Sequence, residues 1–310
     1  MRHVVVSLAL AASCGPSGGL TWDRQSIVGG SVDTADPAVV LIIGHGSSAD
    51  PVITCTGVIA SPHVVLTAAH CLDPDIVGPG RTFTVFTGSD VQDPAQGELP
   101  ANFVHGQETH YDPQFDGRAL SHGHDIGLVV TEAALAAAPL PLNRAPMTPD
   151  LRGRPVRLVG FGIDNDGHAS TIGVRRQVPS TLDGYTDQLL KFADPIHNTC
   201  DGDSGGPALM TLQDTEVVIG ISSFGDASCR KSGAETRVDV YASTFVDPFI
   251  AANDPSMSLP PDAGIKLAMT RANGCDFGGG GIGGGAPFWL LGLLWFVLRA
   301  RGANASRRLT

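Results

Sequence analysis

The stretch Cys200–Pro207, which reads Cys-Asp-Gly-Asp-Ser-Gly-Gly-Pro, places one serine between glycines and beside a carboxylate. A serine hydroxyl becomes an effective nucleophile when a neighbouring base takes its proton and N–H groups stabilise the oxyanion that forms. Ser204 is the candidate nucleophile, and the N–H groups of Gly202 and Ser204 are the candidate donors, because glycine allows the tight path that points them inward. Such residues also form ordinary surface turns, so the stretch predicts chemistry only together with a base from elsewhere.

Three earlier segments supply the missing groups in a fixed order. They read Ile-Val-Gly-Gly from Ile27, Thr-Ala-Ala-His-Cys from Thr67, and His-Asp-Ile-Gly-Leu from His124. Together with Cys200–Pro207 they resemble the four diagnostic motifs of the chymotrypsin-like serine proteases, the trypsin family, across roughly Ile27 to Asn253. The chain order His, Asp, Ser matches that family and excludes esterases of the α/β-hydrolase type, in which the serine comes first.

The resemblance implies a role for each reactive group. His70 would act as the general base, since the pKa of a histidine lies near neutrality. Asp125 would hold the His70 ring in the correct tautomer, and Ser204 would attack the substrate. Gly202 and Ser204 would form the oxyanion hole. His122 and His124 are expected to be bystanders, because proximity to Asp125 alone does not give them a role. We find no convincing metal-ligand spacing among the histidines and acids, so neither a metal site nor a cofactor is expected.

The motif at Ile27 implies activation by cleavage. The freed α-amine would turn inward and pair with Asp203, which would order the oxyanion loop, because a buried ammonium and carboxylate persist when matched. The residue before Ile27 is Ser26 rather than Arg or Lys, although Arg24 lies two residues upstream. An activator with trypsin-like specificity would therefore not cut there.

Substrate binding is assigned by resemblance to five residues: Asn198, Ser223, Phe224, Gly225 and Gly233. Asn198 would form the floor of the primary specificity pocket, where trypsin-like enzymes carry an aspartate. Ser223–Gly225 would hydrogen-bond an extended substrate as an added strand. A neutral amide at the floor predicts no strong preference for Arg or Lys at the cleaved position, although Asp226 at the rim could favour a basic residue.

The chain has six cysteines, and the disulfides that the resemblance implies for four of them would place it in an oxidising, extracytoplasmic compartment. Four of them match family disulfides, which implies the pairs Cys55–Cys71 and Cys200–Cys229; the sequence alone permits other connectivities. The net charge of −11, with no basic run in the body of the chain, excludes nucleic-acid binding that depends on phosphate neutralisation.

The fold class expected from the resemblance is all-β, with two six-stranded antiparallel barrels, the active site between them, and a short C-terminal helix. Abundant glycine and proline with few aromatics agree with a turn-rich β protein. Short β runs are predicted at 39–43, 52–59, 63–66, 83–87, 103–104 and 126–130, and then at 156–162, 177–182, 188–192, 207–210, 217–222 and 236–240. Residues 133–149 would cross between the barrels, and 241–253 would form a helix interrupted at Pro248.

Both ends of the chain carry features of export. Residues 1–13 resemble a signal peptide and 14–26 a propeptide, before a protease domain at 27–253. Cys14 is open to two interpretations, a lipidated residue of a lipoprotein box or a propeptide cysteine after ordinary cleavage.

A linker at 254–274 precedes a tail at 275–310 with Cys275, a glycine tract and a thirteen-residue apolar run. That run is shorter than the roughly 20 residues of a membrane-spanning helix. The tail resembles myxobacterial sorting tags; the alternative is an uncleaved anchor or a peripheral amphiphilic tail.

These features together predict a secreted or cell-surface serine endopeptidase made as a zymogen. Its partners would be a protein or peptide substrate and an activating protease, with membrane contact only through the termini. The alternative function is a catalytically inactive family member that serves as a binding module. Such members typically lose a triad residue, whereas His70, Asp125 and Ser204 are all present.

Overall fold

The computed structural model describes residues 25–28, 30–47, 50–163, 171–193, 198–200, 202–226 and 232–258, with only the backbone course described for 25–28 and 198–200. The expected signal peptide, the start of the propeptide, most of the linker and the C-terminal tail lie outside these residues. Among the helices of the described part, none is long and apolar enough to cross a membrane.

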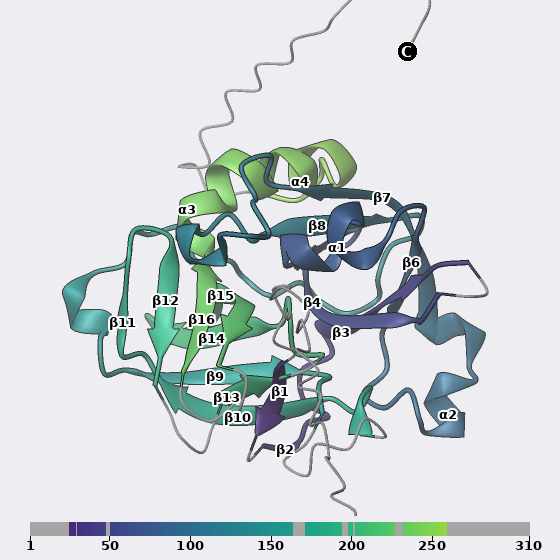
Figure 1. Cartoon of the computed structure of the whole chain (residues 1–310), viewed down its shortest axis with the longest axis horizontal. Coiled ribbons are helices and arrows are strands. Elements are labelled where there is room, and N and C mark those ends of the chain that lie inside the picture. Colours follow the sequence, from purple (N-terminus) through teal and green to yellow (C-terminus); the bar gives the residue numbers. More distant parts are fainter. Residues whose placement is uncertain are drawn as a thin grey trace, which may run out of the picture. The chain divides into compact units, whose positions relative to one another are not determined.

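The first half of the chain closes into a barrel of six antiparallel strands, as predicted (Figure 1). Around the barrel the strand order is β3-β4-β5-β8-β7-β6. The strands are β3 (Val39–His45), β4 (Ile53–Ser61), β5 (Val64–Thr67), β6 (Thr82–Phe86), β7 (Phe103–Tyr111) and β8 (Gly127–Thr131). Every residue of β5 and β8 is buried, so these apolar strands form the centre of the first core. Two short helices, α1 (Pro74–Val77) and α2 (Pro94–Gly97), lie in the connections.

Strand β7 is longer than the two-residue run expected from the sequence. Its C-terminal part, Gln107–Tyr111, is mostly polar and exposed, and its pairing with β8 is shifted by a bulge between Gly106 and Glu108. A bulge breaks the alternation of inward and outward side chains along a strand. The hydrophobic pattern therefore stops at Val104 although the strand continues.

The second half forms an eight-stranded antiparallel sheet in the order β11-β12-β16-β15-β14-β9-β10-β2. It holds the six predicted strands together with two short strands at its ends. The bounds are β2 (Ser31–Val32), β9 (Pro155–Gly160), β10 (Arg176–Thr181), β11 (Gly184–Tyr185), β12 (Leu189–Phe192), β14 (Pro207–Leu212), β15 (Thr215–Gly225) and β16 (Gly233–Arg237). Strands β1 (Gln25–Val28) and β13 (Asn198–Cys200) make a separate antiparallel pair.

The segment between β8 and β9 crosses from the barrel to the second sheet. Within it, Asn143 N–H donates to the Val218 carbonyl at 2.9 Å, and Val218 N–H donates to the Pro141 carbonyl at 2.8 Å. The crossing segment is thereby fixed to β15 rather than looping free.

The closing helix begins earlier than predicted and is divided differently. The expected strand at 236–240 ends at Arg237, where α3 (Val238–Tyr241) begins and leads through a π-helical turn (Ala242–Val246) into α4 (Asp247–Asn253). Pro248 stands in the first turn of α4, a position where its missing N–H costs nothing, so it starts a helix rather than interrupting one.

Helix α4 packs on the first barrel although it follows the second sheet. The rings of Phe249 and His110 of β7 lie 4.5 Å apart. Beyond the helix, Asp254 accepts hydrogen bonds from His63 N at 2.9 Å and from the Ser61 hydroxyl, and its other oxygen lies 2.7 Å from His63 Nδ1. The C-terminal end of the helix is thereby clasped to the β4–β5 turn.

Candidate active site

The half-buried His70 and the fully buried Asp125 form a pair at adjacent ends of β5 and β8. His70 lies in the short helix η1 (Ala69–Cys71) that follows β5, and Asp125 precedes β8. His70 Nδ1 lies 2.8 Å from Asp125 Oδ2, and the backbone N–H of His70 donates to Asp125 Oδ1 at 2.9 Å. Because a carboxylate only accepts hydrogen bonds, this contact places the ring proton on Nδ1 and leaves Nε2 as the acceptor.

The second sheet holds the Asp125 residue from the opposite side. The Ser223 hydroxyl of β15 donates to Asp125 Oδ2, and the Thr236 hydroxyl of β16 donates to the Asp125 carbonyl at 2.8 Å. Asp125 is fully buried, so these bonds replace the water that the group loses. The sequence assigned Ser223 to substrate binding and did not reveal its contact with Asp125.

The nucleophile loop that contains Ser204 is anchored on β4 of the barrel. Thr56 N–H donates to the Ser204 carbonyl, and the Thr56 hydroxyl donates to the Gly202 carbonyl, both at 2.8 Å. Gly205 has a φ of +84°, and a Cβ there would lie 2.0 Å from the Thr67 hydroxyl oxygen. Only glycine fits this close approach, which explains the residue after the candidate nucleophile.

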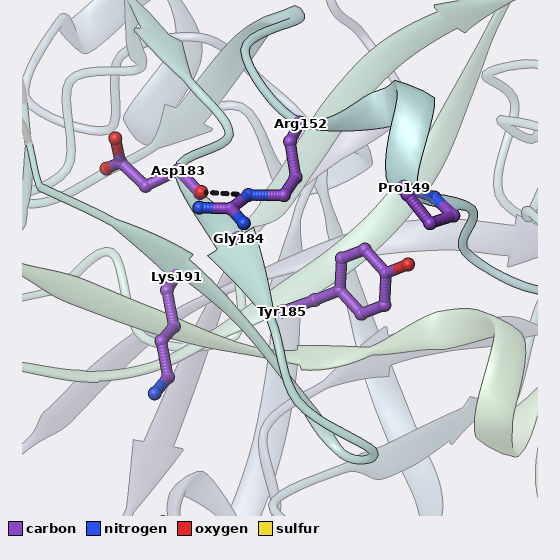
Figure 2. A pocket seen from close by; sticks show the side chains of 6 residues that line it. All are labelled: Pro149, Arg152, Asp183, Gly184, Tyr185 and Lys191. Atoms are coloured by element: carbon purple, nitrogen blue, oxygen red, sulfur yellow. Dashed lines mark hydrogen bonds between the residues drawn. The ribbon is translucent and has the colours of Figure 1, made fainter.

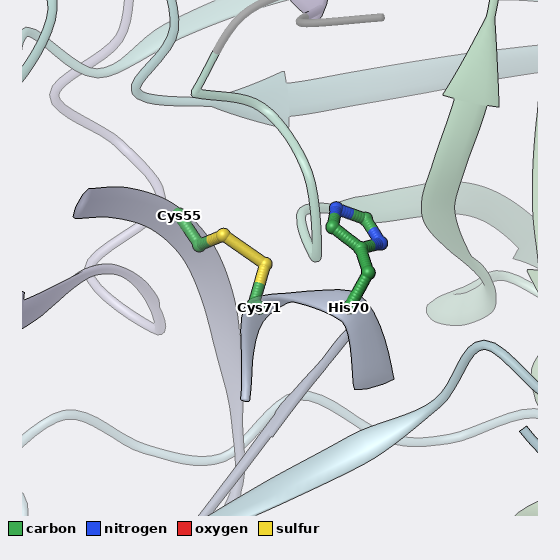
Figure 3. Close-up of side chains that lie close together, drawn as sticks. All are labelled: Cys55, His70 and Cys71. Atoms are coloured by element: carbon green, nitrogen blue, oxygen red, sulfur yellow. A yellow bond between two sulfur atoms is a disulfide. The ribbon is translucent and has the colours of Figure 1, made fainter. Parts of the chain in front are cut away.

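The loop and His70 meet beside a disulfide. Cys55 and Cys71 are bonded, as predicted, with their Cα atoms 6.3 Å apart, and Cys71 Sγ lies 3.7 Å from the Ser204 carbonyl oxygen. Figure 3 shows this disulfide next to the His70 ring. Within the described residues no hydrogen bond joins the Ser204 hydroxyl to His70, so the structure brings the two residues onto neighbouring segments without closing that bond.

The same three side chains, Cys55, His70 and Cys71, are close enough to suggest a metal site. Their ligand atoms lie within 4.8 Å of one another. Zinc is bound by thiolates, however, and the two sulfurs are bonded to each other. This cluster therefore does not offer the donor set of a zinc site.

Ile27 and Asp203 were expected to meet after cleavage of the chain. Strand β1 includes Ser26 and Ile27 and pairs with β13, with Val28 opposite Asn198 and a shift of register between Gln25 and Val28. This is therefore the arrangement of the uncleaved chain. Asp203 is fully buried, and its Oδ1 accepts a hydrogen bond from Gly162 N–H at 2.8 Å.

The predicted substrate-binding residues lie on two paired strands where the structure describes them. Gly225 at the end of β15 is opposite Gly233 at the start of β16, and Phe224 is opposite Ala234. Asn198 lies in β13, of which only the backbone is described. Cys229 and the expected Cys200–Cys229 disulfide also lie outside the described residues.

One buried carboxyl near these strands was not found from the sequence. Glu235 of β16 has 1% of its surface exposed, and its Oε2 has no hydrogen-bond partner within the described part. Burial raises the pKa of Glu235 well above its usual range, and the Asp203 carboxylate raises it further. In the sequence, Gly-Ala-Glu-Thr-Arg gives no sign that the glutamate points inward.

A separate hollow of about 500 Å³ opens on the second sheet. Its lining residues are Pro149, Arg152, Asp183, Gly184, Tyr185 and Lys191 (Figure 2). Arg152 Nε donates to the Asp183 carbonyl at 2.8 Å, so the guanidinium is fixed by the chain itself. None of the predicted site residues lines this hollow.

Comparison with known proteins gives consistent matches. A family model described as Trypsin matches residues 27–246. The chain is 26% identical to chymotrypsin-like elastase family member 1 of Macaca fascicularis, over 64% of this chain and 80% of that protein. It is 26% identical to a trypsin of Saccharopolyspora erythraea, over 62% of this chain and 86% of that protein. Brachyurin of Leptuca pugilator is 27% identical, over 62% of this chain and 86% of its own length.

Proposed function

The chain belongs to the trypsin family of serine proteases, and from this premise we propose that it is a serine endopeptidase whose triad is His70, Asp125 and Ser204. The observation that carries the proposal is the contact between the half-buried His70 and the fully buried Asp125. It leaves His70 Nε2 as the free acceptor on the ring, next to the segment that anchors Ser204.

Ser204 Oγ attacks the substrate carbonyl carbon while His70 Nε2 takes its proton, and the peptide oxygen becomes negative. His70 then gives that proton to the leaving amine, which leaves an acyl ester on Ser204. Water attacks the ester by the same route in reverse and restores the hydroxyl. Asp125 balances the charge on the imidazolium throughout.

The N–H groups of Gly202 and Ser204 are the proposed oxyanion donors. Neither donates a backbone hydrogen bond within the described residues, whereas Gly205 N–H and Gly206 N–H both do, at 2.8 Å. Two donors beside the nucleophile that have no backbone partner among the described residues support this role, because a tetrahedral oxyanion is stabilised by such N–H groups.

Activation would proceed by cleavage between Ser26 and Ile27. We propose that the freed amine pairs with Asp203, and that the resulting loop movement lets Ser204 reach His70. The bond between Ser204 and His70, which the described residues of the uncleaved chain do not make, would form in this step. The Cys55–Cys71 disulfide supports an extracytoplasmic location, at the cell surface or outside the cell.

A fluorophosphonate probe tests the proposed function directly. The chain cleaved to begin at Ile27 should gain one covalent adduct, which peptide mass mapping should place on Ser204. The uncleaved chain should react far more slowly, and the Ser204→Ala variant should not react. No adduct on a folded chain whose N-terminus is verified as Ile27 would contradict the proposal and favour a catalytically inactive binding protein.

A further inference from the structure

The backbone immediately before Asp125 follows an uncommon path. His124 has a φ of +66°, in the left-handed region that residues other than glycine seldom adopt, and Gly123 before it has a φ of +82°. Ile126 N–H donates to the His124 carbonyl at 2.9 Å, so the chain makes a three-residue turn with Asp125 at its centre. The direction of the Asp125 side chain therefore depends on the conformation at His124.

The hydroxyl of Tyr241 holds this path from the side of the second sheet. His124 N–H donates to the Tyr241 hydroxyl oxygen at 2.9 Å, and that hydroxyl donates to Gln188 Oε1 at 2.6 Å. Tyr241 ends α3, which follows β16, and Gln188 directly precedes β12. A Cβ on Gly123 would lie 2.4 Å from the Cβ of Gln188, so the turn is packed closely against this pair.

The Tyr241 side chain is buried and neutral, which suits a fixed bond. It has 4% of its surface exposed, and its ring meets the His124 ring edge-on with the centroids 5.7 Å apart. Burial, offset in part by the His124 N–H, raises the pKa of Tyr241 to about 12. The hydroxyl therefore keeps its proton at neutral pH, and it accepts from His124 while it donates to Gln188. Loss of this hydroxyl would remove the acceptor of the His124 N–H.

We propose that Tyr241 is a positioning residue for the proposed triad acid, and that its hydroxyl holds His124 in the left-handed conformation that aims the Asp125 carboxylate at the proposed base. The inference rests on the proposed peptidase function, and Tyr241 acts through the turn rather than on the substrate. The contact uses the backbone of His124, so it does not depend on the ring of that residue. With the hydroxyls of Ser223 and Thr236, the second half of the chain then holds the acid at its carboxylate, at its carbonyl and at the residue before it.

Replacement of Tyr241 by phenylalanine removes the hydroxyl and keeps the ring. The assay uses the chain cleaved to begin at Ile27 and a peptide, selected from a library, that the wild-type chain cleaves. For Tyr241→Phe, kcat should fall about 10-fold, because a displaced acid supports the imidazolium less well. KM should stay within about twofold of the wild-type value, the pattern of an interaction that acts in the transition state.

Tyr185→Phe is the matched control. It makes the same chemical change at a half-buried ring that lies under the Arg237 guanidinium, and it should leave kcat and KM unchanged. An equal fall of kcat in the Tyr185 and Tyr241 variants would contradict the proposal. A rise in KM alone for Tyr241→Phe would also contradict it, since the hydroxyl would then serve substrate binding.

A second measurement does not depend on turnover. In the chain labelled with 15N-histidine, the proton on His70 Nδ1 should resonate downfield of an ordinary imidazole N–H, because a short hydrogen bond to a carboxylate deshields it. The uncleaved chain contains this contact, so the spectra can be recorded in an uncleaved Ser204→Ala background. Tyr241→Phe should move the signal upfield or broaden it by exchange with water, whereas Tyr185→Phe should leave it in place. An unchanged signal in Tyr241→Phe would overturn the proposal.

Gln188→Leu covers the case in which Tyr241→Phe does not fold. Leucine cannot accept from the Tyr241 hydroxyl, which then loses one of its two anchors. The fall in kcat should be about threefold, because the hydroxyl oxygen still accepts from His124, and the His70 signal should move in the same direction. No change in either measurement would contradict the proposal. Wild-type chain that begins at Ile27 and does not react with fluorophosphonate refutes the peptidase function, whereas the His70 signal still decides the role of Tyr241.

Discussion

Replacement of Thr56 by valine would test whether the barrel holds the nucleophile loop through one hydroxyl. Valine keeps the shape of threonine but removes its donor and its acceptor. The Thr56 hydroxyl donates to the Gly202 carbonyl at 2.8 Å and accepts from Phe161 N–H at 3.0 Å. Thr56 and Phe161 are both fully buried, whereas Gly202 is half-buried.

The cost of Thr56→Val follows from what is left unpaired. The buried Phe161 N–H loses its acceptor at a cost of about 1–3 kcal/mol, and the Gly202 carbonyl loses about 0.5–1.5 kcal/mol. The total is about 1.5–4.5 kcal/mol in the free energy of unfolding, or about 3–18 °C in melting temperature for a domain of this size. Displacement of the loop should also slow fluorophosphonate labelling of Ser204, by as much as about 100-fold.

Thermal unfolding followed by circular dichroism measures the first effect, in a Ser204→Ala background that prevents self-digestion. Thr56→Ser is the matched control, because it keeps the hydroxyl and loses a methyl group worth about 0.8 kcal/mol. The reasoning fails if Thr56→Val lowers the free energy of unfolding no more than Thr56→Ser does. It also fails if Ser204 of the Thr56→Val variant reacts with fluorophosphonate at the wild-type rate.

Three other changes probe neighbouring parts of the structure. Ser223→Ala removes a hydrogen bond to the Asp125 carboxylate and should lower kcat/KM about 10-fold with little change in KM; a rise in KM alone would assign Ser223 to substrate binding instead. Gly205→Ala should abolish labelling of Ser204, because its Cβ would overlap the barrel; normal labelling would show that the loop can move aside. Asp254→Asn tests the helix clasp: burial raises the Asp254 pKa, but hydrogen bonds from His63 and Ser61 outweigh it and lower the pKa. Since a lowered pKa stabilises the fold above the unfolded value of about 3.9, the stability advantage of wild type over Asp254→Asn should shrink as pH falls from 6 to 3 in urea titrations. A constant difference would contradict this.

The sequence predicted most of the barrel because its strands carry continuous apolar runs. Val64–Thr67 and Gly127–Thr131 are buried throughout, and both lie within one residue of the predicted bounds. The predicted run at 103–104 was shorter than strand β7 because the C-terminal part of the strand is polar and solvated. The strand β11 (Gly184–Tyr185) was not predicted because two residues are too few to show an alternating pattern. The eight-stranded order of the second sheet depends on long-range pairings that alternation does not encode.

The sequence predicted those parts of the candidate site whose residues belong to recognisable motifs. The His70–Asp125 contact and the Cys55–Cys71 disulfide were expected from the resemblance, and the structure contains both. The support from Thr56 was invisible because an ordinary threonine in a β-strand carries no signal of a distant partner. Glu235 was missed for the opposite reason, since a lone glutamate in a strand predicts an exposed position.

The order of the reactive groups along the chain has a consequence for biosynthesis. His70 and Asp125 emerge from the ribosome well before Ser204, and the hydroxyls of Ser223 and Thr236 that hold Asp125 emerge later still. A nascent or truncated chain that ends before β16 therefore lacks a correctly supported acid, whatever its N-terminus. The proposed triad and the hydroxyls that hold its acid are therefore complete only once β16 has been synthesised.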